Sequence, residues 1–219
     1  MAIVHPDMGA VMPILIALVV AQAAPVAAGR KPPLAAPTPA SCRYDKAAML
    51  ALDERAFDQT MSGGWRALAS AGCDLAAADA IQAWRAAHGG EPRTAALLNW
   101  HEGQLRANAG QTAPAIALFE TARKAPAEDA AFGWNLYVDG SIAFLRRDLA
   151  GLDAARARLA ALPRPPGYAP VGVDGKPRAF AWPMNLNILD GLVACWNRGY
   201  KQAYACAKPA VRTLPPAAD

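Results

Sequence analysis

The stretch PRTAALLNWHEGQLRANAGQTAPAIALFETARKAP, residues 92–126, decides the fold. Apolar residues recur on both sides of Gly110 at the three- and four-residue spacing of an α-helix. Gly110 suits a tight turn, and the small residues Gly103 and Ala115 let two antiparallel helices approach closely. Phe119 then fills the space towards the next pair of helices. The stretch therefore predicts a helical hairpin.

Helical periodicity continues through the chain after residue 44, and no alternating run is long enough to predict a strand. Glycine, proline or aspartate marks most of the breaks. The sequence therefore predicts an all-α fold class. The expected helices cover residues 45–61, 64–71, 74–88, 92–109, 113–124, 129–147, 149–162, 185–197 and 200–208.

The central pattern recurs in weaker copies, whose second helices carry small residues at steps of 38, 40 and 48 residues: Ala77, Ala115, Ala155 and Ala203. In the clearest copy, the spacing of small, turn, aromatic and proline positions is similar to that of a tetratricopeptide repeat. The residues are Gly103, Gly110, Ala115, Phe119, Ala122 and Pro126. Residues 63–208 thus resemble a tetratricopeptide-like helical-repeat protein with degenerate repeats. The resemblance implies antiparallel helix hairpins stacked as a short α-solenoid. An ordinary alanine-rich bundle is the alternative, because similar patterns arise in any antiparallel helix packing.

The resemblance also implies a binding surface, because the first helices of tetratricopeptide hairpins line a concave groove for a peptide or a partner's terminus. Trp100, Gln104 and Asn108 share one helix face independently of the resemblance, since they are four residues apart. The alternative for Trp100 and Phe144 is burial between hairpins. By matched position, the partner-binding residues are Arg66, Trp100, Gln104, Asn108, Tyr137, Phe144 and Arg147.

Composition limits the function classes. The 219 residues include 54 alanines, and charged residues make up 18 %, which excludes a disordered polyelectrolyte. The net charge of +4 is spread along the chain without a basic run, so no nucleic-acid partner is expected. The expected partner is another protein or a peptide, and the oligomeric state stays open.

The N-terminal residues resemble a secretory signal. An apolar run covers residues 11–20, and Ala21-Gln22-Ala23 offers a small-x-small cleavage pattern. Residues 1–10 lack Lys and Arg, so an uncleaved N-terminal membrane anchor is the alternative. We expect a signal peptide at 1–23, a Pro/Ala-rich disordered tether at 24–41, the helical domain at 42–212 and a flexible tail at 213–219. After cleavage no membrane span is expected.

Four cysteines, Cys42, Cys73, Cys195 and Cys206, favour disulfides in an exported chain, since an oxidising compartment lets the bonds persist. Three connectivities are open. Pairing of neighbours in sequence would staple each end of the domain. Buried unpaired thiols are the alternative.

Residues 163–183 form a long loop with six prolines. Loops of this length are often functional. Tyr168, Phe180 and Trp182 supply aromatic anchors, so we expect the loop to pack on the helices, either as a spacer or as a ligand contact.

Catalytic motifs are scarce. His101-Glu102 begins like a zinc-protease helix, but the second histidine that this motif needs is replaced by Leu105. No GxSxG elbow occurs. The sequence therefore predicts no catalytic set, no metal site and no cofactor.

These features favour an exported protein-interaction or scaffolding module that is not an enzyme. One alternative is a small-molecule-binding or hydrolytic domain with a site under the 163–183 loop, near His101 and Glu102. Another is an envelope-associated subunit without a groove ligand.

Overall fold

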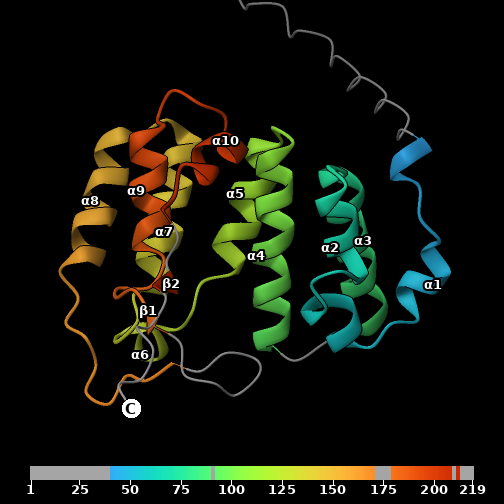
Figure 1. Ribbon diagram of the computed structural model, residues 1–219, viewed down its shortest axis with the longest axis horizontal. Helices are drawn as coiled ribbons and strands as arrows, with labels where there is room; N and C mark the ends of the chain where they lie inside the picture. Colours follow the sequence, from blue (N-terminus) through green and yellow to red (C-terminus); the bar gives the residue numbers. More distant parts are fainter. Residues whose placement is uncertain (1–39, 90–91, 171–178, 209–210, 213–219) are drawn as a thin grey trace, which may run out of the picture. The chain divides into compact units, whose positions relative to one another are not determined.

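A computed structural model describes residues 40–89, 92–170, 179–208 and 211–212, and this part is mostly helical (Figure 1). The predicted all-α class is therefore confirmed. A 3-10 turn (Ala40–Cys42), a π-helical turn (Arg55–Gln59) and strands β1 (Ala179–Phe180) and β2 (Val211–Arg212) are also present. The helices are α1 (Lys46–Leu50), α2 (Gly64–Ser70), α3 (Asp74–His88), α4 (Pro92–Asn108), α5 (Thr112–Thr121), α6 (Pro126–Asp129), α7 (Trp134–Arg146), α8 (Leu149–Ala160), α9 (Leu186–Ala194) and α10 (Tyr200–Ala205).

Several predicted segments lie outside the described residues. These are the signal segment 1–23, the tail 213–219 and most of the tether 24–41. Residues 40 and 41 of that tether belong to the 3-10 turn that ends at Cys42.

The predicted helix 45–61 is interrupted, so the expectation of one continuous helix is wrong. The carboxylate of Asp53 accepts a hydrogen bond from the backbone N–H of Ala56 at 2.7 Å. An aspartate that binds the backbone three residues ahead starts a new turn instead of continuing the old one. The chain therefore forms α1 and then the separate turn Arg55–Gln59.

The predicted helix 129–147 begins later than expected. The two carboxylate oxygens of Asp129 accept hydrogen bonds from the backbone N–H groups of Trp134, at 2.5 Å, and Asn135, at 2.8 Å. Gly133 between them has φ of +69°, which a helix does not allow. Asp129 thus ends α6 and stabilises the first turn of α7.

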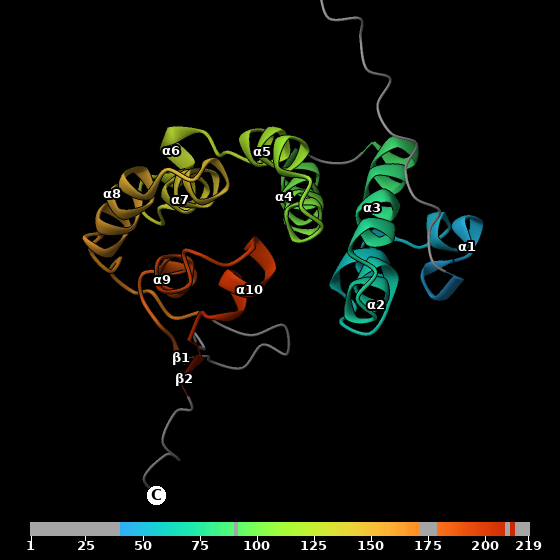
Figure 2. The ribbon, with the colours of Figure 1, turned by 90° about the horizontal axis from the view of Figure 1, so that it is seen from above.

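Consecutive helices pack on one another: α2 on α3, α3 on α4, α4 on α5, α7 on α8, α8 on α9, and α9 on α10 (Figure 2). The α4–α5 pair shows why small residues matter. A Cβ atom on Gly103 would lie 2.6 Å from Cε1 of Phe119 and 3.3 Å from the carbonyl oxygen of Ala115. The predicted close approach of these helices is therefore confirmed.

Helix α4 contributes to two hydrophobic clusters. Trp100 and Ala107 belong to the cluster that α4 shares with α5, α7, α9 and α10. Leu98 and Leu105 belong to the cluster around Phe57 and helices α2 and α3. The two α4 residues in each cluster are seven positions apart, which is close to two helical turns. Helix α4 therefore has two distinct apolar faces.

Two disulfides staple the ends of the helical part. Cys42 pairs with Cys73, with 5.4 Å between their Cα atoms, and Cys195 pairs with Cys206, with 6.4 Å between theirs. Of the three open connectivities, the structure has the pairing of neighbours in sequence. No cysteine is free, so the alternative of buried thiols is wrong.

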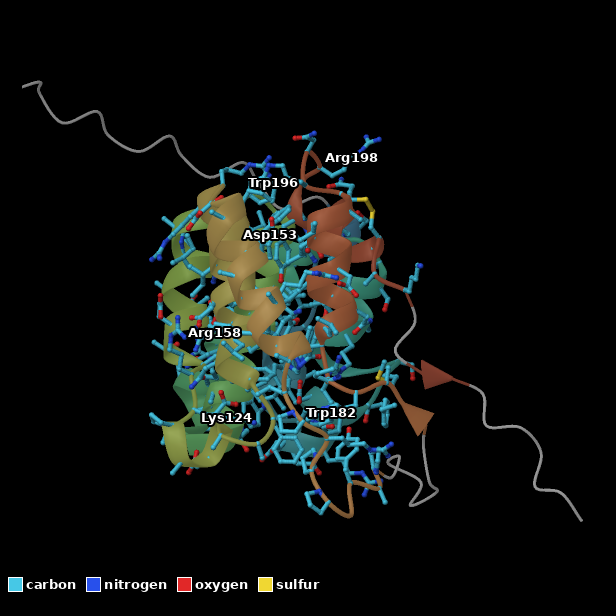
Figure 3. The ribbon with its side chains drawn as sticks, turned by 90° about the vertical axis from the view of Figure 1, so that its left-hand side faces the viewer. Lys124, Asp153, Arg158, Trp182, Trp196 and Arg198 are labelled. Carbon is cyan, nitrogen blue, oxygen red and sulfur yellow. A yellow bond between two sulfur atoms is a disulfide. The ribbon has the colours of Figure 1, made fainter. Side chains whose placement is uncertain are left out.

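The loop 163–183 is described at residues 163–170 and 179–183, and this part contacts the residues that follow α8 and precede α7. The indole N–H of Trp182 donates to the carbonyl oxygen of Leu162 at 2.9 Å, and its ring lies 4.9 Å from that of Tyr168. Figure 3 shows Trp182 and Trp196 at opposite ends of the helices.

Residues 179–180 form β1, which pairs antiparallel with β2. Two residues are too few for alternation to reveal a strand, which explains why the sequence did not predict this pair.

Candidate functional site

A cavity of about 350 Å³ is lined by residues of α2, α4 and α10, and its volume is near the lower end of ligand sites in proteins. We call it the α2–α4–α10 cavity. Helix α10 reaches this place because the chain returns after α9 and packs α10 against α4 (Figure 2). The lining residues are Trp65, Ala69 and Ser70 of α2, Asp74 of α3, His101, Gln104, Leu105 and Asn108 of α4, and Tyr200, Lys201 and Tyr204 of α10.

Helix α4 supplies the polar side of the cavity. His101, Gln104 and Asn108 recur at spacings of three and four residues and therefore share one helix face. The side chains of Gln104 and Asn108 are half-buried and carry both hydrogen-bond donors and acceptors. Two of the partner-binding residues expected from the sequence thus line the cavity.

The facing helices supply aromatic rings. Tyr200 and Tyr204 are one helical turn apart on α10, and their ring centres are 5.9 Å apart. Trp65 lines the cavity from α2, where its ring lies 5.0 Å from that of His101. Aromatic rings beside amide groups suit a ligand that offers both apolar contacts and carbonyl groups.

An ion pair crosses the rim of the cavity. The Lys201 ammonium lies 2.7 Å from the Asp74 carboxylate. The Asn108 amide donates to the other carboxylate oxygen of Asp74 at 3.3 Å. The charge of the Asp74 carboxylate is therefore compensated by Lys201, and both of its oxygens have partners within the chain.

The buried carboxylate of Asp58 lies behind the lining residues that α2 and α4 contribute to the cavity. Asp58 is 2 % exposed, and one oxygen accepts from the Trp65 indole N–H at 2.8 Å. The same oxygen lies 3.0 Å from Nδ1 of His101 and 3.4 Å from Nη2 of Arg66. The carboxylate thereby fixes the orientation of both rings.

The environment lowers the pKa of Asp58 below its ordinary value of 3.8. Burial by itself raises this pKa, but the hydrogen bonds from His101 and Trp65 and the charges of His101 and Arg66 outweigh burial. Asp58 is therefore a carboxylate at neutral pH.

The hydroxyl groups of Tyr137, Tyr200 and Tyr204 lie in a more apolar environment than the Asp58 carboxylate. The hydroxyl oxygens of Tyr137 and Tyr204 are 3.4 Å apart, and the Tyr200 hydroxyl is buried without a hydrogen-bond partner among the described residues. Burial, with the nearby Tyr204, raises the pKa of both Tyr137 and Tyr200. Tyr137 and Tyr200 are therefore neutral at neutral pH.

Three other residues expected to bind a partner lie in the hydrophobic core. Trp100, Tyr137 and Phe144 are 3 %, 2 % and 2 % exposed. The Trp100 ring stacks on that of Phe119 at 4.2 Å, which is the burial named above as the alternative. Packing accounts for these side chains, and none of them lines the cavity.

The two expected arginines make contacts within the chain. Arg66 donates from Nε to the backbone oxygen of Asp58 at 2.5 Å. Arg147 is exposed at the end of α7, donates to the backbone oxygen of Trp196 at 2.6 Å and lies 4.1 Å from its ring centre. Neither arginine lines the cavity.

Glu102 points away from the alternative site proposed near His101. Its carboxylate is 2 % exposed and is paired with Arg85 and, at 2.7 Å, with Arg106. No described residue of the 163–183 loop lines the cavity, and residues 171–178 of that loop lie outside the described residues. Of the two residues named for this alternative site, His101 lines the cavity and Glu102 does not.

Sequence reasoning missed Trp65, Asp74, Tyr200, Lys201 and Tyr204. A signal for the tyrosines was present, because they are four residues apart and share a helix face. Their position opposite α4 had no local signal, since more than 90 residues separate the two helices.

A second cavity, of about 530 Å³, is lined by α4, residues 122–125 between α5 and α6, α6 and the start of α7. Its Arg123 is already paired with Glu120 and Asp139. Its lining contains no amide and no tyrosine side chain, in contrast to that of the α2–α4–α10 cavity.

Comparison of the chain with known protein families, curated proteins and solved structures finds no match. Within the described residues, no group of three or more His, Cys, Asp or Glu side chains could hold a metal ion. None of the described helices is long and apolar enough to cross a membrane.

Proposed function

We propose that this protein is an exported interaction module that holds a segment of a partner protein in the α2–α4–α10 cavity. One observation carries the proposal: the half-buried amide side chains of Gln104 and Asn108 line a cavity to which the facing helices contribute aromatic rings. Amides bind peptide backbone groups, and Trp and Tyr are enriched among the residues that matter most for binding at protein interfaces.

The proposal includes export to the periplasm or outside the cell. The two disulfides, Cys42–Cys73 and Cys195–Cys206, support it, because such bonds persist in oxidising compartments. The apolar run at residues 11–20 and the pattern Ala21-Gln22-Ala23 supply the signal peptide in this proposal.

It also includes a tetratricopeptide-like arrangement of degenerate helix pairs. Pairwise packing of consecutive helices and the close approach at Gly103 support this arrangement. In such an arrangement α4 is a first helix, and its face with Gln104 and Asn108 is the groove face.

The test is site-specific photo-crosslinking in cells that produce the full chain. A photoreactive phenylalanine analogue replaces Gln104 in one variant and Gln82, an exposed residue of α3 outside the cavity, in the matched control. We expect a discrete crosslinked partner at Gln104 that is absent at Gln82. Identical products at both positions, or none at Gln104, contradict the proposal.

A second candidate function is small-molecule binding or hydrolysis at His101. The observation that favours it is the 3.0 Å contact between Asp58 and Nδ1 of His101, which orients the ring beside the cavity. An imidazole held by a carboxylate is a common general base. His101→Ala abolishes any such activity while leaving a partner crosslink at Gln104, and this outcome separates the two candidates.

A further inference from the structure

The disulfide between Cys195 and Cys206 encloses the whole of α10. Cys195 is the C-cap residue of α9, and Cys206 is the C-cap residue of α10. The residues that α10 contributes to the α2–α4–α10 cavity, Tyr200, Lys201 and Tyr204, all lie between the two cysteines. One covalent bond therefore closes the short segment that forms one wall of the cavity.

The noncovalent contacts of α10 are limited. The helix has six residues, of which Tyr200 and Ala203 are buried. A helix this short is not stable by itself. Lys201 pairs with Asp74, but its side chain is 47 % exposed, so solvent screens the charge. The disulfide is therefore the covalent link that keeps α10 folded back beside α9, where it packs against α4.

The two disulfides of the protein differ in accessibility. Cys206 is exposed and Cys195 is half-buried, whereas Cys73 is 5 % exposed and Cys42 is half-buried. Thiol–disulfide exchange begins when a thiolate reaches one sulfur of the bond, so its rate depends on access. A dithiol in solution therefore reaches Cys206 most readily, and exposed disulfides are typically the labile ones.

The chain that follows α10 stays attached to α9 without the disulfide. A Cβ atom on Gly191 of α9 would lie 2.6 Å from the backbone nitrogen of Ala207, so the two segments are in close contact there. The side-chain amide of Asn187 donates to the carbonyl oxygen of Lys208 at 2.7 Å. These contacts keep the two cysteines near each other after reduction, which lets the bond form again on oxidation.

We propose that Cys195–Cys206 is a redox switch of the α2–α4–α10 cavity, whereas Cys42–Cys73 is a permanent staple. A dithiol reductant opens the switch in two steps. One thiolate of the dithiol attacks Sγ of Cys206, which forms a mixed disulfide and releases Sγ of Cys195 as a thiolate that takes up a proton. The second thiolate then displaces Sγ of Cys206, which also takes up a proton. The dithiol becomes a disulfide, and the protein gains two electrons and two protons.

The reduced protein has a loosened α10 and a cavity that is open on the side of Lys201 and Tyr204. The cause is chain entropy, because the segment regains backbone freedom that the closed loop denies it. The switch goes beyond the function proposed above, since it concerns the wall of the cavity whatever its occupant. Its tests follow the protein alone, so the switch and the proposed function fail separately.

The first experiment measures which disulfide is reduced. The oxidised full-length protein is treated with dithiothreitol under native conditions, free thiols are trapped with N-ethylmaleimide over time, and mass spectrometry locates the label. We expect Cys195 and Cys206 to be labelled about tenfold faster than Cys42 and Cys73. We also expect air oxidation to restore the bond once the dithiol is removed. Equal rates, faster reduction of Cys42–Cys73, or a bond that does not form again overturn the proposal.

The second experiment measures the wall itself by hydrogen exchange and mass spectrometry. After selective reduction we expect backbone amides 203–207 to exchange about tenfold faster, while α5 and α8 keep their native rates. Cys195→Ser/Cys206→Ser shows the fast rates without reductant and does not respond to it. Cys42→Ser/Cys73→Ser is the matched control, in which the dithiol still accelerates exchange in α10. Unchanged exchange in α10 of the reduced native protein overturns the proposal, and this measurement decides even where a serine variant fails to fold.

Discussion

Lys201 on α10 forms an ion pair with Asp74 at the first residue of α3, although 127 positions separate them in the sequence. The contact links α10, the last of the described helices, to an early one across the α2–α4–α10 cavity. Three segments distant in the sequence, α2–α3, α4 and α10, thus meet at one site.

Loss of this ion pair has a small effect on stability. Lys201 is 47 % exposed in its side chain, so solvent and salt screen its charge. We expect Lys201→Ala to lower the free energy of unfolding by about 0.5 kcal/mol, as measured by urea titration at low salt. The loss shrinks at high salt. An equal loss for Lys46→Ala, at an exposed position on α1, contradicts this account.

Close packing at Gly103 makes this position intolerant of a side chain. Gly103→Ala places a methyl group against the ring of Phe119, so we expect a loss of about 1–3 kcal/mol in the free energy of unfolding. Phe119→Leu removes the atoms that clash. In a double-mutant cycle the combined variant is less destabilised than the sum of the single changes, and simple additivity refutes the packing explanation.

Acid unfolding depends on Asp58. Because its pKa is lowered in the folded protein, the unfolded chain binds the proton first as pH falls below about 3.8. Stability therefore decreases between 3.8 and the lower folded pKa. Asp58→Asn lacks this contribution, and its free energy of unfolding changes less over that interval.

At neutral pH, Asp58→Asn loses charge-assisted hydrogen bonds, and we expect a cost of about 2 kcal/mol. Urea titrations at a series of pH values measure both effects. Asp153→Asn, at an exposed position on α8 (Figure 3), serves as the control and should show neither. A pH profile of Asp58→Asn parallel to that of the native protein refutes the assignment.

We expect the buried hydroxyl of Tyr200 to contribute little to stability, although the side chains of Gln104 and Ser141 lie near it. It has no hydrogen-bond partner among the described residues, so its burial carries a desolvation cost without a compensating bond. We expect Tyr200→Phe to leave thermal stability unchanged or to raise the free energy of unfolding by about 1 kcal/mol. A melting temperature clearly below that of the native protein means that the hydroxyl is hydrogen-bonded in solution.

The two disulfides differ in the length of chain that they close. Cys42–Cys73 spans 31 residues, and Cys195–Cys206 spans 11. Loop-closure entropy predicts losses of about 4 and about 3 kcal/mol when each pair is replaced by alanine. Urea titration of the two double variants measures the difference. A larger loss for the shorter loop shows that local contacts around α9 and α10, and not chain entropy, dominate.

The sequence by itself determined the features that depend on local physics. Helical period and small-residue spacing are encoded within one or two turns, so the all-α class and the approach of α5 to α4 at Gly103 followed from it. The sequence favoured disulfides but left their connectivity open, and the structure has the pairing of neighbours. The breaks at Asp53 and Asp129 were missed, because their side chains compete with the helix through individual hydrogen bonds.

Only the tertiary structure decided which helix faces are buried and which line the cavity. Periodicity showed that Trp100, Gln104 and Asn108 share a side of α4, but Trp100 is covered by Phe119 and Tyr137 whereas the amides face a cavity. Tyr204 and Lys201 join them from α10 through contacts between residues far apart in the chain. Such contacts depend on the packing of whole helices, for which no single stretch of sequence carries the signal.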